Sequence, residues 1–182
     1  MTRYFNRLRG FSLAIAVIVA GLAPLLNAEE KETLAGAQNF TRIDQTFAAG
    51  GIIAVEAFPE LKKRGFKSVI NLRMPTERNA NVEAEAEAVR AAGLKYIGLP
   101  FNVANANARE VVDQFLTAIG DPANQPTYVH SAQAHRVMGL WLIKRVRVDH
   151  WAVDRALAEA EAVGLSETSR QFALDYVKPY AR

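Results

Sequence analysis

The sequence contains no cysteine. Thiolate nucleophiles, persulfides, disulfides and sulfur-ligated zinc are therefore excluded, and the apolar core alone must stabilise the fold. No pair of carboxylates and no group of histidines has the spacing of a metal site, and no sequence pattern implies a cofactor. With 182 residues, 50% of them hydrophobic, the chain is long enough for one globular domain.

An excess of positive charge is confined to the N-terminus. The chain has 22 Lys and Arg against 19 Asp and Glu. Residues 1–28 hold three of the basic residues (Arg3, Arg7 and Arg9) and no acidic one, so residues 29–182 have 22 minus 3, or 19, of each sign and no net formal charge. Nucleic-acid-binding domains typically carry a basic stripe, so we expect no nucleic-acid partner.

The first 28 residues have the layout of a secretory signal peptide, because the arginines precede an apolar run over 11–26. This run is shorter than the roughly 20 residues of a membrane-spanning helix, and Gly21 and Pro24 interrupt it. We expect export to the periplasm or the medium. The alternative is an uncleaved, outward-facing membrane anchor, since the run is long for a signal peptide and Leu26 is not a small residue. Any membrane contact would be made by this segment.

After a polar stretch over 29–38, predicted to be a linker, strands alternate with helices over 39–182. This order predicts an α/β domain with a central, largely parallel sheet flanked by helices, because parallel neighbours need a helical crossover. Ligands of such sheets bind at the carboxyl ends of the strands. The predicted strands are 40–44, 46–51, 68–72, 95–99 and 127–129, and the predicted helices are 57–65, 82–92, 110–119, 137–146, 152–163 and 166–176.

Polar groups are concentrated in the predicted loop after strand 127–129. A cation at a helix N-terminus is unfavourable by up to about 1 kcal/mol, and a bound anion would reverse that sign. We therefore predict that Arg136, the helix dipole and the backbone N–H groups of 132–136 bind a phosphate or sulfate. Alternatively, Arg136 pairs with a carboxylate and the histidines are ordinary loop residues. The loop residues are His130, Ser131, Ala132, Gln133, Ala134, His135 and Arg136.

The tract from 127 to 141 contains the pattern His130-Ser131-x-x-x-x-Arg136. It resembles the phosphate loop of the cysteine-dependent tyrosine and dual-specificity phosphatase superfamily, in particular a bacterial group whose domain also occurs fused to beta-lactamase-like hydrolases. The likeness extends from about 39 to 165. It implies a phosphotyrosine-phosphatase-like three-layer fold, with Ser131 at the position of the nucleophilic cysteine, Arg136 as the phosphate-binding arginine and His130 as the residue that organises the loop.

The loop departs from that pattern at four positions. A serine hydroxyl has no thiolate fraction and needs a base such as His130 or His135 to become a nucleophile. Gln133, Ala134 and His135 stand where family loops have Ser, Gly and Asn, and a positive φ at Ala134 would cost about 1–2 kcal/mol. The short loop also resembles that of rhodanese-like sulfurtransferases, but their chemistry requires a cysteine as well.

Two further segments bear on the site. The family's general acid should follow strand 95–99, yet residues 100–108 contain three asparagines and no acid, and an amide cannot transfer a proton. Arg73, at the end of strand 68–72, could support a bound anion, although an ion pair with Glu77 explains it equally well.

We therefore expect an exported phosphatase-like protein, catalytically impaired, that binds a phosphorylated protein or a small phosphorylated or anionic ligand at the loop from Ser131 to Arg136. One alternative is an active phosphate-ester hydrolase that uses Ser131 with a neighbouring histidine. The other is a protein-interaction domain that has lost the pocket.

Overall fold

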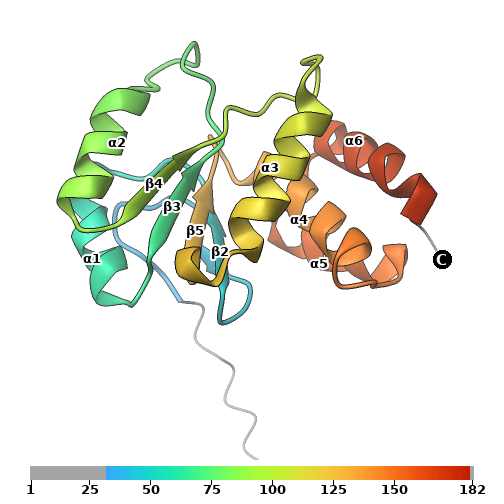
Figure 1. Ribbon diagram of the computed structural model, residues 1–182, viewed down its shortest axis with the longest axis horizontal. Coiled ribbons are helices and arrows are strands. Elements are labelled where there is room, and N and C mark those ends of the chain that lie inside the picture. The colour runs from blue at the N-terminus through green and yellow to red at the C-terminus, as the bar shows by residue number, and fades with distance from the viewer. Residues whose placement is uncertain (1–31, 181–182) are drawn as a thin grey trace, which may run out of the picture. The chain divides into compact units, whose positions relative to one another are not determined.

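The computed structural model describes residues 32–180 (Figure 1). The predicted signal peptide, residues 1–28, lies outside this range. The described part of the predicted linker packs on the domain, because Leu34 is buried and Ala37 forms a β-bridge with Ile53. No helix within 32–180 has both the length and the apolar character needed to span a bilayer.

A five-stranded sheet with the order β1-β2-β5-β3-β4 forms the centre of the domain. Only the β1–β2 pair is antiparallel, and the other three pairs are parallel, so the predicted sheet is confirmed. The short hairpin partner β1 extends the sheet at one edge, and β4 forms the other edge. The strands are β1 (Thr41–Arg42), β2 (Phe47–Gly50), β3 (Ser68–Asn71), β4 (Lys95–Gly98) and β5 (Thr127–His130).

All six predicted helices form, with small shifts of their ends. Two of them begin two residues earlier than predicted, at Ala108 and His135. Ser166 caps the last one, since its hydroxyl accepts a hydrogen bond from the Ser169 N–H. The helices are α1 (Phe58–Lys63), α2 (Val82–Ala91), α3 (Ala108–Gly120), α4 (His135–Arg147), α5 (Val153–Val163) and α6 (Glu167–Val177), joined by short 3-10 turns at Val55–Ala57, Pro122–Asn124 and Lys178–Tyr180.

The two faces of the sheet are covered by different helices. Figure 1 shows α1 and α2 on one side of the strands and α3 to α6 on the other. Successive strand residues accordingly enter different cores, because side chains alternate between the faces of a sheet. Tyr128 packs in the cluster with α1 and α2, whereas Val129 packs in the larger cluster on the opposite face. The domain is therefore a three-layer α/β structure, as predicted.

Helix α4 lies at the centre of the larger core, packed between the sheet and α5 and α6. Its Trp141 ring stacks on Phe47 of β2 with 4.0 Å between ring centroids. Gly139 allows α6 to approach closely, because a Cβ at this position would lie 3.0 Å from the Ser169 Cβ. This contact holds the N-terminus of α6 near the N-terminus of α4.

Candidate functional site: the loop between β5 and α4

The loop between β5 and α4 is shorter than predicted. β5 includes His130 and α4 already begins at His135, so only residues 131–134 lie between them. The loop is tied to the segment after β2 at two points. The Ser131 N–H donates to the Gly50 carbonyl at 3.3 Å, and the Ile52 N–H donates to the Ala132 carbonyl at 3.2 Å.

Ala134, at the N-cap of α4, has the left-handed backbone conformation that the family's glycine would favour. Its φ is +69° and its ψ is −15°. The left-handed region brings a Cβ close to the backbone, so this alanine carries a strain of about 1–2 kcal/mol. Only 1% of its surface is exposed, which indicates that packing holds the strained turn in place.

A cavity of about 340 Å³ opens over this loop, at the carboxyl ends of the strands. Four segments line it: the loop with the first turn of α4, the stretch after β3, the stretch after β4, and the N-terminus of α6. The position agrees with the rule for ligand sites in open α/β sheets. The lining residues are Glu77, Asn102, Val103, Ser131, Ala132, Gln133, His135, Arg136, Ser166, Thr168 and Ser169.

Ser131 lies at the base of the cavity and is only 1% exposed. Its hydroxyl has no hydrogen-bond partner among residues 32–180. In particular, neither His130 nor His135 forms a hydrogen bond with it, although the sequence suggested either one as a base. The described structure thus places no general base within hydrogen-bond distance of this hydroxyl.

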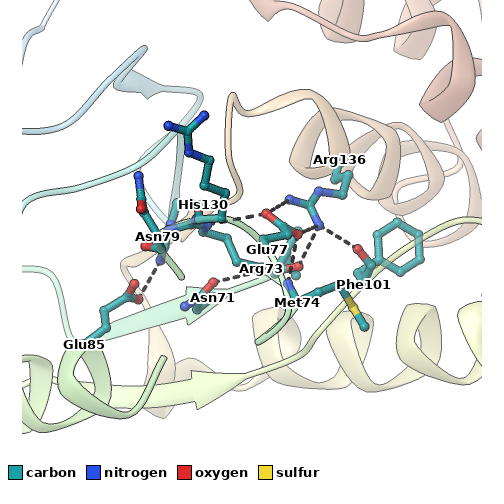
Figure 2. Close-up of polar contacts among 11 residues, drawn as sticks. Asn71, Arg73, Met74, Glu77, Asn79, Glu85, Phe101, His130 and Arg136 are labelled. Carbon is teal, nitrogen blue, oxygen red and sulfur yellow. Dashed lines mark hydrogen bonds and ion pairs between the residues drawn. The ribbon is translucent and has the colours of Figure 1, made fainter. Parts of the chain in front are cut away.

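The guanidinium of Arg136 is held firmly from one side (Figure 2). Its Nη1 and Nη2 donate to the two carboxylate oxygens of Glu77, at 2.6 and 3.0 Å. Nη1 also donates to the carbonyls of Leu72 and Phe101, at 3.2 and 2.9 Å. The ion pair that the sequence offered as the alternative for Arg136 is thus present.

The pair with Glu77 does not use every donor of Arg136. A guanidinium has five N–H groups, and its Nε–H and the adjacent Nη2–H form a second fork beside the one that Glu77 occupies. The Nε–H makes no hydrogen bond to any residue in the range 32–180. Because Arg136 lines the cavity, this second fork can bind a phosphate or a carboxylate bidentately.

Glu77 connects Arg136 to the segment after β3. Besides Arg136, its carboxylate accepts from the Met74 N–H at 2.9 Å and lies 3.5 Å from the Nε of Arg73. Burial alone would raise the pKa of Glu77, but the hydrogen bonds from Arg136 and Met74 outweigh it, and the pKa lies below its usual value. Glu77 is therefore ionised at neutral pH and is a fixed counterion of Arg136.

Arg73 supports the site from behind and does not line the cavity. Its side chain is 5% exposed, and it donates to the carbonyls of Arg78 at 2.7 Å and Asn79 at 3.2 Å. With Glu77 beside it, all of its nitrogens have partners. The ion pair with Glu77, which the sequence offered as the alternative for Arg73, is thus present.

His130 is buried behind the loop. Its Nε2 lies 2.8 Å from a carboxylate oxygen of Glu85 on α2, its Nδ1 has no partner in the described structure, and its ring stacks on Tyr128. Burial and then the negative charge of Glu85 raise the pKa of Tyr128. His130 thus connects the end of β5 to α2.

Several residues that line the cavity could not be predicted from the sequence. Ser166, Thr168 and Ser169 lie 30 or more positions after Arg136 and reach the cavity only because α6 packs on α4. Asn102 does come from the segment expected to hold a general acid, and Glu77 is the only carboxylate in the lining. Nowhere in residues 32–180 do three or more His, Cys, Asp or Glu side chains gather in a way that could hold a metal ion.

A protein family described as "DSP-PTPase phosphatase fused to NAD+ Kinase" matches residues 19–169. The chain belongs to this family. Curated relatives are NAD kinase 2 of Arabidopsis thaliana, 23% identical over 155 residues, and probable NAD kinase 2 of Oryza sativa subsp. japonica, 28% identical over 92 residues, both described as chloroplastic. These matches cover 85% and 50% of this chain but only 15% and 9% of the respective relatives, so the phosphatase-family domain corresponds to a small part of them.

Solved phosphatase structures share the fold. A putative phosphatase (DUF442) from Shewanella putrefaciens CN-32 has a TM-score of 0.67 at 19% identity over 86% of this chain and 99% of its own. The catalytic core of the PP-IP phosphatase SIW14 from S. cerevisiae, in complex with citrate, gives 0.64 at 20% identity over 79% and 88%. P. aeruginosa TpbA, also solved with phosphotyrosine, gives 0.59 at 20% over 79% and 89%. The predicted phosphotyrosine-phosphatase-like fold is confirmed.

Proposed function

We propose that this protein is a catalytically impaired member of the phosphatase family that binds a phosphorylated protein or a small phosphorylated or anionic ligand at the loop from Ser131 to Arg136. One observation carries the proposal. Arg136, whose second fork makes no hydrogen bond within residues 32–180, lines the same cavity as Ser131, whose hydroxyl has no hydrogen-bond partner in that range. The site thus retains groups that bind an anion and lacks groups that would transfer a phosphoryl group.

The binding part rests on three kinds of donor. The first N–H groups of α4 have no intrahelical acceptor, and the positive end of the helix dipole lies at the same place. The free Arg136 donors add a charge-assisted fork. In two proteins of the same fold, SIW14 and TpbA, structures contain citrate and phosphotyrosine, both of them anions. We propose that a phosphate group occupies the equivalent place here.

The impaired chemistry rests on what surrounds Ser131, which we propose stands at the position of the family's nucleophile. A serine needs an adjacent general base, and neither neighbouring histidine forms a hydrogen bond with its hydroxyl. Protonating a leaving group needs an acid, and Asn102 is an amide. Glu77 does not substitute for the acid, because its low pKa keeps it ionised.

The proposed place of action is outside the cytoplasm. This part of the proposal depends on the N-terminal sequence alone, with its three arginines and apolar run. Expression of the full chain followed by mass spectrometry of the periplasmic fraction tests it. A mature protein that begins near residue 29 supports export with cleavage, whereas a full-length protein in the cytoplasm contradicts it.

Calorimetric titration of the purified protein with phosphate and vanadate tests the binding site. We expect saturable binding that Arg136→Ala abolishes and that Arg155→Ala, at an exposed arginine of α5, leaves unchanged. Ser131→Cys should bind as the parent does and gain activity toward an aryl phosphate.

The same experiment separates the two alternatives. Turnover by the parent protein that Ser131→Ala abolishes would establish an active serine-based hydrolase and contradict impairment. An absence of phosphate and vanadate binding in every variant would identify a protein-interaction domain without a working anion site.

A further inference from the structure

Strand β4 forms one edge of the sheet, and β1 forms the opposite edge. In the described part of the chain it pairs only with β3, and both of its end residues, Lys95 and Gly98, are exposed. Figure 1 shows β4 running in front of β3. An edge strand presents a row of unpaired N–H and C=O groups to any chain that can align with it.

Alternate residues of β4 supply the groups on this open edge. The N–H groups of Lys95 and Leu99 donate to the carbonyls of Lys67 and Asn71, so the odd-numbered residues point toward β3. Because backbone groups alternate in direction along a strand, the N–H and C=O groups of Tyr96 and Gly98 point outward. Two complete peptide-pairing positions are therefore open.

Each face of the edge has its own hollow. Tyr96 and Gly98 line a cavity of about 450 Å³ on the α2 side, together with Val82, Ala86 and Pro100. On the α3 side, Lys95 and Ile97 line a cavity of about 600 Å³ together with Thr117. A strand added beside β4 would direct successive side chains alternately into these two hollows.

Strand β4 is weakly protected against pairing with another chain. Natural edge strands often place a lysine across the open edge. The ammonium of Lys95 instead donates to the side-chain oxygen of Asn124 at 2.7 Å, which holds it against the 3-10 turn before β5. Gly98 has no side chain to hinder an approaching backbone.

Carboxylates outnumber cations in the lining of the α3-side hollow, three to one, and equal them in the lining of the α2-side hollow, two to two. Four of them form no ion pair within residues 32–180: Glu83 and Glu87 on the α2 side, and Glu110 and Asp121 on the α3 side. A fifth, Asp113, pairs with Arg147. The cations in the two linings are Arg73, which pairs with Glu77, Arg90, which lies over the Tyr96 ring, and Lys95, which is bonded to Asn124. Among the groups without an ion pair, four carboxylates thus face two cations. The field at this edge therefore favours a cationic partner.

We propose that β4 is a docking site for an extended, basic segment of a partner protein, which adds as a sixth strand to the sheet. The backbone groups of Tyr96 and Gly98 provide the pairing. The two hollows accept alternate apolar and basic side chains, and the unpaired carboxylates select lysine or arginine over acidic residues. This surface is separate from the cavity over Ser131.

The probe is the peptide acetyl-KLVKLT-amide, which places one lysine on each face of an added strand. Titrated into the full-length protein by NMR, it should shift the amide signals of Tyr96 and Gly98 in a saturable manner and slow their hydrogen exchange. The same peptide with glutamate in place of lysine should bind about fivefold more weakly or worse. Equal binding of the two peptides would overturn the charge selection, and an unchanged Gly98 amide would overturn the pairing.

A matched pair of variants at Gly98 isolates the backbone bond. Gly98→Pro removes the outward N–H while leaving the bonds to β3 intact, and proline is tolerated where the N–H of an edge strand faces solvent. Gly98→Ala keeps the N–H. We expect the proline variant to bind the peptide about fivefold more weakly than the alanine variant, because the loss of one net hydrogen bond weakens binding by about this factor. Equal binding of the two, or sedimentation showing that β4 is already covered by a second copy of the chain, would refute the proposal.

Discussion

The loop over residues 131–134 and the polar groups behind it differ in how well their hydrogen-bonding capacity is satisfied. In the loop, the Ser131 hydroxyl has no partner and Ala134 is held at a positive φ. Behind it, Glu77 and Arg136 form a bidentate pair that also binds the carbonyls of two neighbouring segments. The position of the arginine is thus fixed by contacts that do not involve residue 131. The contacts that hold Arg136 would therefore persist if residue 131 were replaced.

The largest effect is expected from removing the arginine itself. Arg136→Ala leaves Glu77 and two carbonyls without their donor and should lower the free energy of unfolding by about 3 kcal/mol, the low end for a broken buried pair, because both side chains are partly exposed. Urea denaturation measures this loss. Arg155→Ala, the surface control, should stay within about 0.5 kcal/mol of the parent. Equal losses in the two variants would mean that the polar groups behind the loop do not hold the arginine.

The ion pair also predicts a pH dependence. The folded pKa of Glu77 is lowered, so its contribution to stability is complete above the unfolded value of 4.5 and is lost as the pH falls through the folded pKa. Glu77→Gln should therefore cost about 1.5–3 kcal/mol at pH 7 and distinctly less near pH 3. Denaturation of both proteins across this range provides the test. The exposed control Glu83→Gln should show little difference at either pH, and a constant cost for Glu77→Gln would contradict the lowered pKa.

In the loop, by contrast, we expect a substitution to raise the free energy of unfolding. Ser131→Ala removes a buried hydroxyl that has no partner and should raise the free energy of unfolding by about 1 kcal/mol. Ser68 is the matched control, since its buried hydroxyl bonds Asn124 and Thr127 at 2.7 and 2.8 Å. Ser68→Ala should be destabilising by about 1 kcal/mol. If both variants lose stability equally, the Ser131 hydroxyl has an unrecognised partner.

The smallest effect is expected at the strained turn. Ala134→Gly relieves about 1–2 kcal/mol of left-handed strain and loses about 0.8 kcal/mol of methyl burial, a net gain of about 0.5 kcal/mol. Ala88→Gly, inside α2, should instead cost about 1 kcal/mol. Thermal unfolding of the two variants distinguishes the signs. Destabilisation at 134 as large as at 88 would show that the left-handed turn carries no strain.

Local sequence patterns were sufficient to predict the sheet and the helices. Alternation of apolar residues located the strands, and the 3.6-residue period located α3 and α4 to within two residues at their N-termini. The polar loop at the strand-to-helix junction located the cavity. The condition for strain at Ala134 could also be stated beforehand, because the resemblance places a glycine of the family's loop at this position and a residue with a Cβ is strained at positive φ.

Contacts between distant segments were beyond those patterns. The Glu77–Arg136 pair joins residues 59 positions apart, and the His130–Glu85 pair joins residues 45 positions apart. The sequence suggested Glu77 only as a partner of Arg73, and Glu85 lies in a run of glutamates that is typical of a solvated helix surface. The contribution of α6 to the cavity depends on how closely α6 packs against α4. This distance cannot be read from the sequence of either helix alone.

That packing gives Gly139 an influence on ligand size. A side chain here would meet the Ser169 Cβ at 3.0 Å and the Ser169 carbonyl at 3.2 Å, so α6 would have to move outward. Ser166, Thr168 and Ser169 would move with it, and they form one wall of the cavity. A residue that touches no ligand thus sets the distance between the walls of the site. Among related sequences, the volume of residue 139 should vary with the size of the molecule that each member accommodates.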